Sequence, residues 1–126
     1  MTVERKAIDQ GGSGRMEARV EKITDQDFNL RVLESQKPSV VDFWATWCVP
    51  CQRLDEVLEE VAERYNGKVT FFKVDVNESS GTASRYSVWS IPTLLFFHGG
   101  EVVDHAVGAL SREAILEKVD KLLATR

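Results

Sequence analysis

Cys48 and Cys51 are the only cysteines in this chain of 126 residues, and two residues separate them. Residues three apart share one face of a helix, so the two sulfur atoms can approach bonding distance without a backbone rearrangement. Such a pair can exchange two electrons with another disulfide. Pro50 stands between the cysteines, and proline suits the first turn of a helix, where its missing N–H leaves no bond unmade. The motif therefore predicts a helix that begins at a redox-active pair.

The predicted nucleophile is Cys48, the first residue of the pair. The unpaired amides and the partial positive charge of a helix start stabilise a thiolate, which lowers the pKa of the thiol. Cys48 would attack a substrate disulfide, and Cys51, deeper in the helix, would resolve the mixed disulfide. The predicted net reaction is the reduction of a protein disulfide.

Two other uses of the cysteines are weaker interpretations. A zinc site would need His98 and His105, which lie in or beside a predicted hairpin and lack the usual spacing of a second ligand pair. A purely structural disulfide would restrain little of the unfolded chain, because the loop that it closes is short. We expect no metal ion, and no cofactor other than the Cys48–Cys51 disulfide.

Composition and length fit one compact domain, since a chain of this size with 43% hydrophobic residues can bury a core without structural disulfides or metal. Residues 1–18 hold few large apolar side chains and a Gly-Gly-Ser-Gly run. They predict a flexible N-terminal arm before a domain over residues 19–126. An added tail, a shortened leader and a native arm would have the same composition.

Charge and hydropathy narrow the expected partners and the compartment. The net charge is −4 and the basic residues form no block, which disfavours nucleic acid as a partner. No apolar run reaches the roughly 18 residues that span a bilayer, and the first 16 residues contain no apolar signal core. We expect a monomeric cytoplasmic protein with no membrane partner, unless a leader was removed.

Alternating strands and helices are predicted around the cysteines. Apolar runs and periodicity predict strands at 20–23, 40–45, 69–76, 93–97 and 101–107. Helices are predicted at 24–35, from the cysteines to about residue 66, at 79–86, and from Ser111 onward. The βαβαβαββα order predicts an α/β fold with a mixed five-stranded sheet, helices on both faces, and an antiparallel edge at the final hairpin.

Two segments, Trp-Ala-Thr-Trp-Cys-Val-Pro-Cys at 44–51 and Ile-Pro-Thr at 91–93, resemble the signature segments of the thioredoxin family. The similarity covers residues 19–125 and includes Val-Asp-Phe-Trp at 41–44, Lys-Val-Asp at 73–75 and Val-Gly-Ala at 107–109. The resemblance implies the thioredoxin fold and a protein-disulfide reductase that serves electron transport and cell redox homeostasis. It also implies a thioredoxin reductase as the electron donor.

The resemblance assigns roles to two charged residues. Asp42 matches the buried carboxylate that relays a proton to and from the resolving cysteine, and burial in an apolar strand should raise its pKa toward neutrality. Lys73 matches the lysine that approaches this carboxylate. The alternatives are a solvated acid on an exposed strand face and an ordinary surface lysine.

A substrate-docking surface is also implied by the resemblance. Pro92 matches the family's cis-proline, beside which the backbone of Ile91 pairs with an extended substrate segment. The residues implied for this surface are Trp47, Val49, Pro50, Trp89, Ile91, Pro92, Gly100 and Gly108. Trp44 and Trp89 could equally be ordinary packing residues.

One departure from the family pattern bears on the direction of the reaction. Val49 stands where the family most commonly has a glycine between the cysteines, and its side chain places bulk beside the attacking sulfur. The reduction potential and the choice of partner are therefore left open. Oxidising relatives commonly carry histidine between the cysteines. Val49-Pro50 offers neither charge nor donor, which favours a reductant over an oxidant or isomerase. A redox-inert binding module is disfavoured because both cysteines, Asp42 and Pro92 are present.

Overall fold

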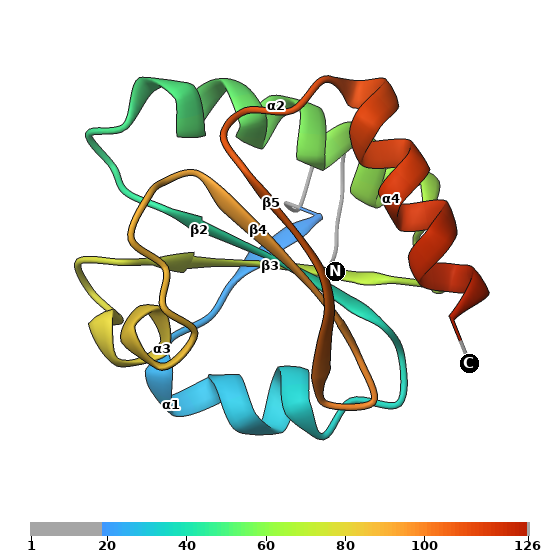
Figure 1. Cartoon of the computed structure of the whole chain (residues 1–126), viewed down its shortest axis with the longest axis horizontal. Helices are drawn as coiled ribbons and strands as arrows, with labels where there is room; N and C mark the ends of the chain where they lie inside the picture. Colours follow the sequence, from blue (N-terminus) through green and yellow to red (C-terminus); the bar gives the residue numbers. More distant parts are fainter. Residues whose placement is uncertain (1–18, 126) are drawn as a thin grey trace, which may run out of the picture.

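The computed structural model describes residues 19–125, so the predicted flexible arm at 1–18 lies outside the described residues. Figure 1 shows a central sheet between two layers of helices. The elements along the chain are β1 (Val20–Lys22), α1 (Asp25–Phe28), the π-helical turn η1 (Asn29–Leu33), β2 (Ser39–Trp44), α2 (Val49–Arg64), β3 (Thr70–Asp75), α3 (Ser80–Arg85), β4 (Thr93–His98), β5 (Glu101–Val107) and α4 (Arg112–Ala124). The predicted α/β fold with a mixed five-stranded sheet is confirmed.

The strand order in the sheet is β1-β3-β2-β4-β5, which places β2 in the centre. β1 and β2 both pair with β3 in parallel, whereas β4 runs antiparallel to β2 and β5 antiparallel to β4. Antiparallel pairing thus begins at β4, one strand earlier than the hairpin alone predicts. The connection over residues 76–92 contains only the short helix α3, and β4 begins with Thr93 opposite Phe43, at the same end of the sheet where β3 ends with Asp75 opposite Trp44.

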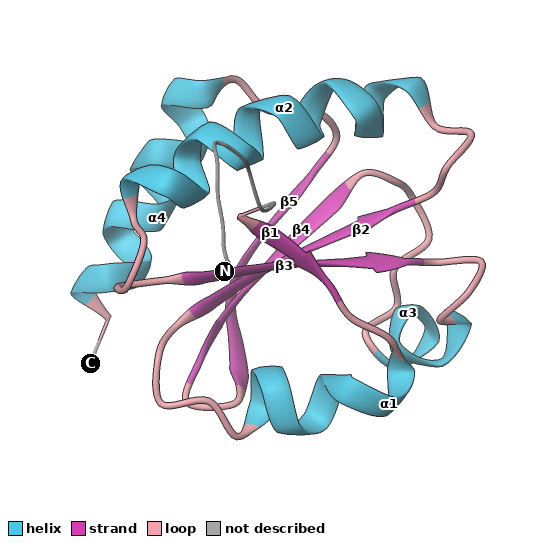
Figure 2. Ribbon diagram, turned by 180° about the vertical axis from the view of Figure 1, so that it is seen from behind, coloured by secondary structure: helices cyan, strands magenta, loops and turns pink. Residues whose placement is uncertain are grey.

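Helices cover both faces of the sheet, as Figure 2 shows from behind. The face under α2 and α4 contains Val40 of β2, and the face under α1, η1 and α3 contains Val41 and Phe43. Successive strand residues point to opposite faces, so a strand covered on both sides must be apolar almost throughout. Asp42 is therefore an exception that the packing does not explain.

The first helical segment differs from the regular α-helix predicted over 24–35. It is α-helical only from Asp25 to Phe28 and continues as the π-helical turn η1, where the Glu34 N–H donates to the Asn29 carbonyl at 3.0 Å. The side chains of Phe28 and Val32 are still buried on one side. Apolar spacing over so few residues does not distinguish these two ways of closing a helical turn, which explains the difference.

A side chain from α1 holds the start of α3. The Asp25 carboxylate accepts hydrogen bonds from the Gly81 N–H (3.1 Å), the Thr82 N–H (2.8 Å) and the Thr82 hydroxyl (2.6 Å). These amides have no partner within a helix start, so the carboxylate supplies one. The hydrogen bond from the Thr82 hydroxyl is the main reason that the pKa of Asp25 lies below its usual value. The contact fixes α3, which leads into residues 86–92 near the cysteines.

Candidate active site

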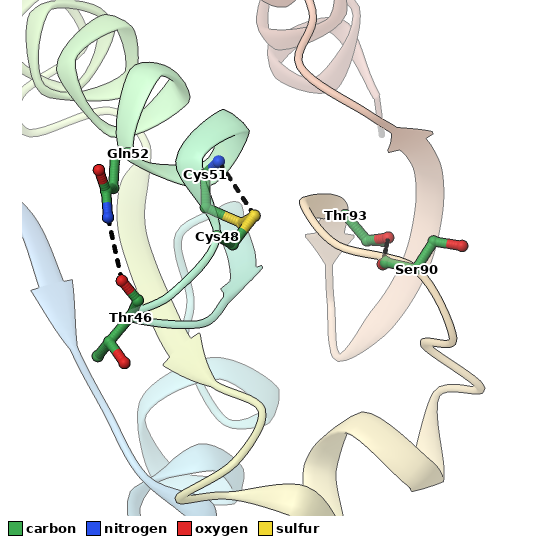
Figure 3. The surroundings of a disulfide bond; sticks show 6 residues. All are labelled: Thr46, Cys48, Cys51, Gln52, Ser90 and Thr93. Atoms are coloured by element: carbon green, nitrogen blue, oxygen red, sulfur yellow. Dashed lines mark hydrogen bonds between the residues drawn. A yellow bond between two sulfur atoms is a disulfide. The ribbon is translucent and has the colours of Figure 1, made fainter.

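The cysteines lie where the central strand β2 passes into the helix α2. Three residues separate the end of β2 from Cys48, and the Cys48 N–H donates to the Ala45 carbonyl at 3.1 Å. Cys48 is the N-cap residue of α2, and its Sγ accepts a hydrogen bond from the Cys51 N–H at 3.2 Å (Figure 3). Pro50 occupies the first turn, as predicted from its missing N–H. The sulfur of Cys48 therefore faces the positive end of the helix.

Cys48 and Cys51 form a disulfide, with their Cα atoms 5.3 Å apart. Cys48 is 5% exposed and Cys51 is 1% exposed, so Cys48 is the more accessible sulfur of a largely buried pair. Trp47 and Val49 flank Cys48 and are well exposed. An incoming disulfide thus meets Cys48 first, and an in-line attack on Cys51 would have to pass through packed side chains.

Asp42 is buried in β2, on the side of the sheet that faces α2. It is 1% exposed and lines a cavity of about 170 Å³ together with Cys51. Neither of its carboxylate oxygens accepts a hydrogen bond from any residue between 19 and 125. The pKa of Asp42 is raised to about 7, mainly by burial and further by the negative charge of Asp55, while the positive charge of Lys73 acts in the opposite direction.

Lys73 enters the same cavity from β3, where it is the register partner of Asp42. Its ammonium lies 3.3 Å from Asp55 Oδ1 and 5.0 Å from the centroid of the Trp44 ring. The structure thus brings Lys73 to the cavity but pairs it with Asp55. Sequence reasoning missed Asp55, although a signal existed: Asp55 follows Cys51 by four residues and so shares its face of α2.

The loop before β4 forms the other side of the site (Figure 3). The Ile91–Pro92 peptide bond is cis, and Ile91 packs against the cluster that contains both cysteines. The Pro92 carbonyl accepts a hydrogen bond from the Gly108 N–H at 2.8 Å, and the Thr93 hydroxyl donates to the Ser90 carbonyl at 2.5 Å. The first bond holds the loop against the end of β5, and the second closes the loop on itself.

Exposed apolar side chains surround this part of the molecule. Trp89 is 81% exposed and Trp47 is 66% exposed, which excludes a core-packing role for either. Trp89 and Val107 line a surface cavity of about 410 Å³ beside the loop. Large apolar groups left in contact with water on one side of a protein commonly mark an interaction surface.

Gly100 does not belong with these residues, which corrects the placement implied by the family resemblance. It lies in the turn between β4 and β5, beyond His98, whereas the cysteines lie near the start of β4. A strand of six residues spans about 17 Å, so the turn is at the opposite end of the sheet. The φ of Gly100 is +82°, and a Cβ there would lie 3.0 Å from the Leu33 carbonyl oxygen, which explains the glycine.

No group of three or more His, Cys, Asp or Glu side chains within residues 19–125 is arranged to hold a metal ion. No helix of this part of the chain is long and apolar enough to cross a membrane.

Known proteins resemble the chain over the same region. The family model described as Thioredoxin matches residues 19–121. The chain is 48% identical over 98 residues to Thioredoxin 2 of Chlorobaculum tepidum, which covers 78% of this chain and 90% of that protein. It is 48% identical over 102 residues to a thioredoxin of Staphylococcus epidermidis (81% and 96% covered) and 42% identical over 102 residues to Thioredoxin 1 of a Nostoc species (81% and 95% covered).

Replacement of Asp42 by Asn should stabilise the oxidised protein in a pH-dependent way. An acid whose pKa is about 7 when folded and 3.8 otherwise keeps its proton in the folded state after the unfolded chain has lost it. The stability of the wild type therefore falls as the pH rises from about 4 to about 7, and then levels off. At 1.36 kcal/mol per pKa unit this amounts to at most roughly 4 kcal/mol.

Urea unfolding of both proteins at pH 4 and pH 8 measures this effect. Asp42→Asn should be more stable by about 1–4 kcal/mol at pH 8, and the difference should shrink at pH 4. A difference of the same size at both pH values would show that ionisation of Asp42 is not its source.

Proposed function

The chain belongs to the thioredoxin family, and we propose that it acts as a reductant of protein disulfides, with Cys48 as nucleophile and Cys51 as resolving thiol. It is a thiol:disulfide oxidoreductase that exchanges electrons through the Cys48–Cys51 disulfide. The observation that carries the proposal is the position of Cys48 as the N-cap of α2, bonded to a more buried Cys51.

The reaction has two exchange steps. The Cys48 thiolate attacks one sulfur of the substrate disulfide, a mixed disulfide forms, and one substrate thiolate leaves. The Cys51 thiol then loses its proton and attacks Cys48, which releases the second substrate thiolate and closes the Cys48–Cys51 disulfide. Two electrons pass to the substrate, and the helix start favours the thiolate form of Cys48 at the first step.

Asp42 is proposed as the proton relay for the second step. Its carboxylate takes the proton of Cys51 as the thiolate forms, and returns it when the disulfide is reduced again. The shared cavity of about 170 Å³ supports this role, because it is large enough to hold water between the two groups. A pKa near 7 suits a group that must both accept and donate a proton at neutral pH.

The direction of the reaction follows from what surrounds Cys48. Val49 and Pro50 bring no charge and no side-chain donor to the sulfur, so the residues between the cysteines add nothing to the stabilisation that the helix start gives the thiolate. Weaker stabilisation of the reduced form makes the pair a better reductant. We propose a thioredoxin reductase as electron donor, a monomeric state and a cytoplasmic location in which the protein serves electron transport.

Substrates are proposed to dock between the helix start and the cis-proline loop. Ile91 would pair with an extended substrate segment through its backbone, and the exposed rings of Trp47 and Trp89 would supply apolar contact. The surface proposed here consists of Trp47, Val49, Pro50, Trp89, Ile91, Pro92 and Gly108.

The reducing direction is tested by the reduction potential. Equilibration of the protein in glutathione and dithiothreitol redox series, followed by thiol counting, should give a potential more negative than about −200 mV. A potential near −120 mV or −180 mV, in the range of strong oxidants and isomerases, would instead support the alternative of an oxidant or isomerase.

The two cysteines should fail in different ways when replaced. Cys48→Ser should not react with substrate disulfides, whereas Cys51→Ser should still attack and then accumulate a mixed disulfide, because only the resolving step is lost. Both variants should lose catalysed insulin reduction. Mass spectrometry of each variant after exposure to an aromatic disulfide detects the adduct, and equal trapping by both variants would refute the assigned roles.

The relay role of Asp42 predicts a changed pH profile. An aromatic disulfide releases one coloured thiolate when Cys48 attacks and a second when Cys51 resolves, so stopped-flow absorbance separates the two steps. Asp42→Asn should slow the second release by roughly 10- to 100-fold at neutral pH and remove its inflection near pH 7. This loss lies at or below the lower limit of the roughly 10²- to 10⁴-fold typical of general acid–base catalysis, since water can also accept the proton. An inflection that persists would leave Asp42 without a relay role.

A further inference from the structure

The cavity beside the disulfide has charged side chains at its mouth that the exchange reaction does not itself require. Its inner residues, Asp42 and Cys51, are each 1% exposed. The side chains of Asp55 and Lys73 also line the cavity and are 36% and 22% exposed. The cavity therefore reaches solvent past one acid and one base.

The ammonium of Lys73 is held away from the carboxylate that its strand position favours. Lys73 and Asp42 are register partners on neighbouring strands, so the side chain can extend toward Asp42. Instead, its Nζ lies 3.3 Å from Asp55 Oδ1 and 5.0 Å from the centroid of the Trp44 ring. Both Asp42 oxygens lack a hydrogen-bond partner within residues 19–125. A carboxylate and an aromatic face together hold a cation in one place.

We propose that Asp55 is a positioning residue of the exchange reaction, which holds Lys73 at the mouth of the cavity and so keeps Asp42 without a counter-ion. The inference rests on the proposed role of Asp42 as proton relay. In this role Asp55 acts on the relay through Lys73 and through its own charge.

Few titratable groups face Asp42 in the cavity. The titratable groups that face it are Cys51, Asp55 and Glu56 from α2 and Lys73 from β3, while β4 contributes the apolar Leu94. After burial, the charge of Asp55 is the largest factor that raises the pKa of Asp42, and Lys73 opposes it. Removal of the Asp55 charge would end a repulsion and free Lys73 to approach Asp42, and both changes lower that pKa.

The consequence for the reaction concerns base strength. When Cys51 gives its proton to Asp42, the new thiolate breaks the bond between Cys48 and the substrate, and the Cys48–Cys51 bond forms. A carboxylate with a pKa near that of the medium accepts this proton more readily than one with an ordinary low pKa. Asp55 thus sets the pH at which the resolving step is fast.

Asp55→Asn tests the inference with two readouts. The titration midpoint of the Asp42 carboxyl group, followed by its ¹³C chemical shift in the oxidised protein, should fall by about one pH unit. In the aromatic disulfide assay, the inflection of the second thiolate release should move down by the same amount. A thermal melt of each variant establishes that the fold is intact.

Glu56→Gln is the matched control, because it removes an equal charge from the next residue along the lining of the same cavity. Glu56 is exposed and forms no ion pair with Lys73 in the described part of the chain. The control should therefore move both readouts clearly less than Asp55→Asn does. Shifts of equal size would mean that general charge in the cavity, and not the contact with Lys73, sets the behaviour of Asp42.

A double-mutant cycle separates positioning from direct charge. Lys73→Met should raise the Asp42 midpoint, and Asp55→Asn in the Lys73→Met background should give a smaller shift than in the wild type. An equal shift in both backgrounds would refute positioning through Lys73. If Asp55→Asn changes neither readout while Asp42→Asn still removes the inflection, the role of Asp55 is wrong and the relay stands. If Asp42→Asn also keeps the inflection, the proposed relay is what fails.

Discussion

The short connection between β2 and α2 is the constraint on which the site depends. β2 is held by hydrogen-bonded strands on both sides, and α2 is held on the sheet by its buried leucines and valine. The link between them is only four residues long, and the hydrogen bond from Cys48 to Ala45 closes it into a turn. Packing of β2 and α2 in the core therefore fixes both the direction of the helix dipole and the position of Cys48. The sulfur is held at the N-terminus of α2 without a further conformational change.

The position that suits a proton relay is also one in which a carboxylic acid is costly to ionise. Asp42 lies on the face covered by α2, in the cavity that it shares with Cys51, and neither of its oxygens has a hydrogen-bond partner within residues 19–125. Burial raises the pKa of Asp42 to near neutrality, and the same burial means that ionisation of Asp42 lowers the stability of the fold. The charges of Asp55 and Lys73 lie on the solvent side of the same cavity. These two partly exposed residues can adjust the pKa of Asp42 without a change in the core.

The parts of this structure that could be predicted from sequence are those with short-range causes. The helix start at Pro50, the apolar strand around Asp42 and the final hairpin each follow from residues next to one another. The direction of β4 depends on how the connection from β3 returns to the sheet, and η1 depends on which carbonyl closes the helical turn. The spacing of apolar residues encodes neither. The Asp55–Lys73 ion pair joins a helix to a strand, so it could be predicted only with knowledge of how α2 packs on the sheet. Gly100 was placed by resemblance, yet a hairpin that starts beside the cysteines must turn at the far end.

The strand order also has a consequence for local opening of the sheet. The edge strands are the three-residue β1 and the largely exposed β5, whereas β2 has a hydrogen-bonded neighbour on each side. Amides in edge strands exchange with solvent through small local fluctuations, while those of a doubly paired central strand exchange only when most of the domain unfolds. Fraying of β1 therefore leaves the disulfide and the Asp42 carboxyl group in register, whereas fraying of β5 would also release the Pro92 carbonyl from the Gly108 N–H and so loosen the loop beside the cysteines.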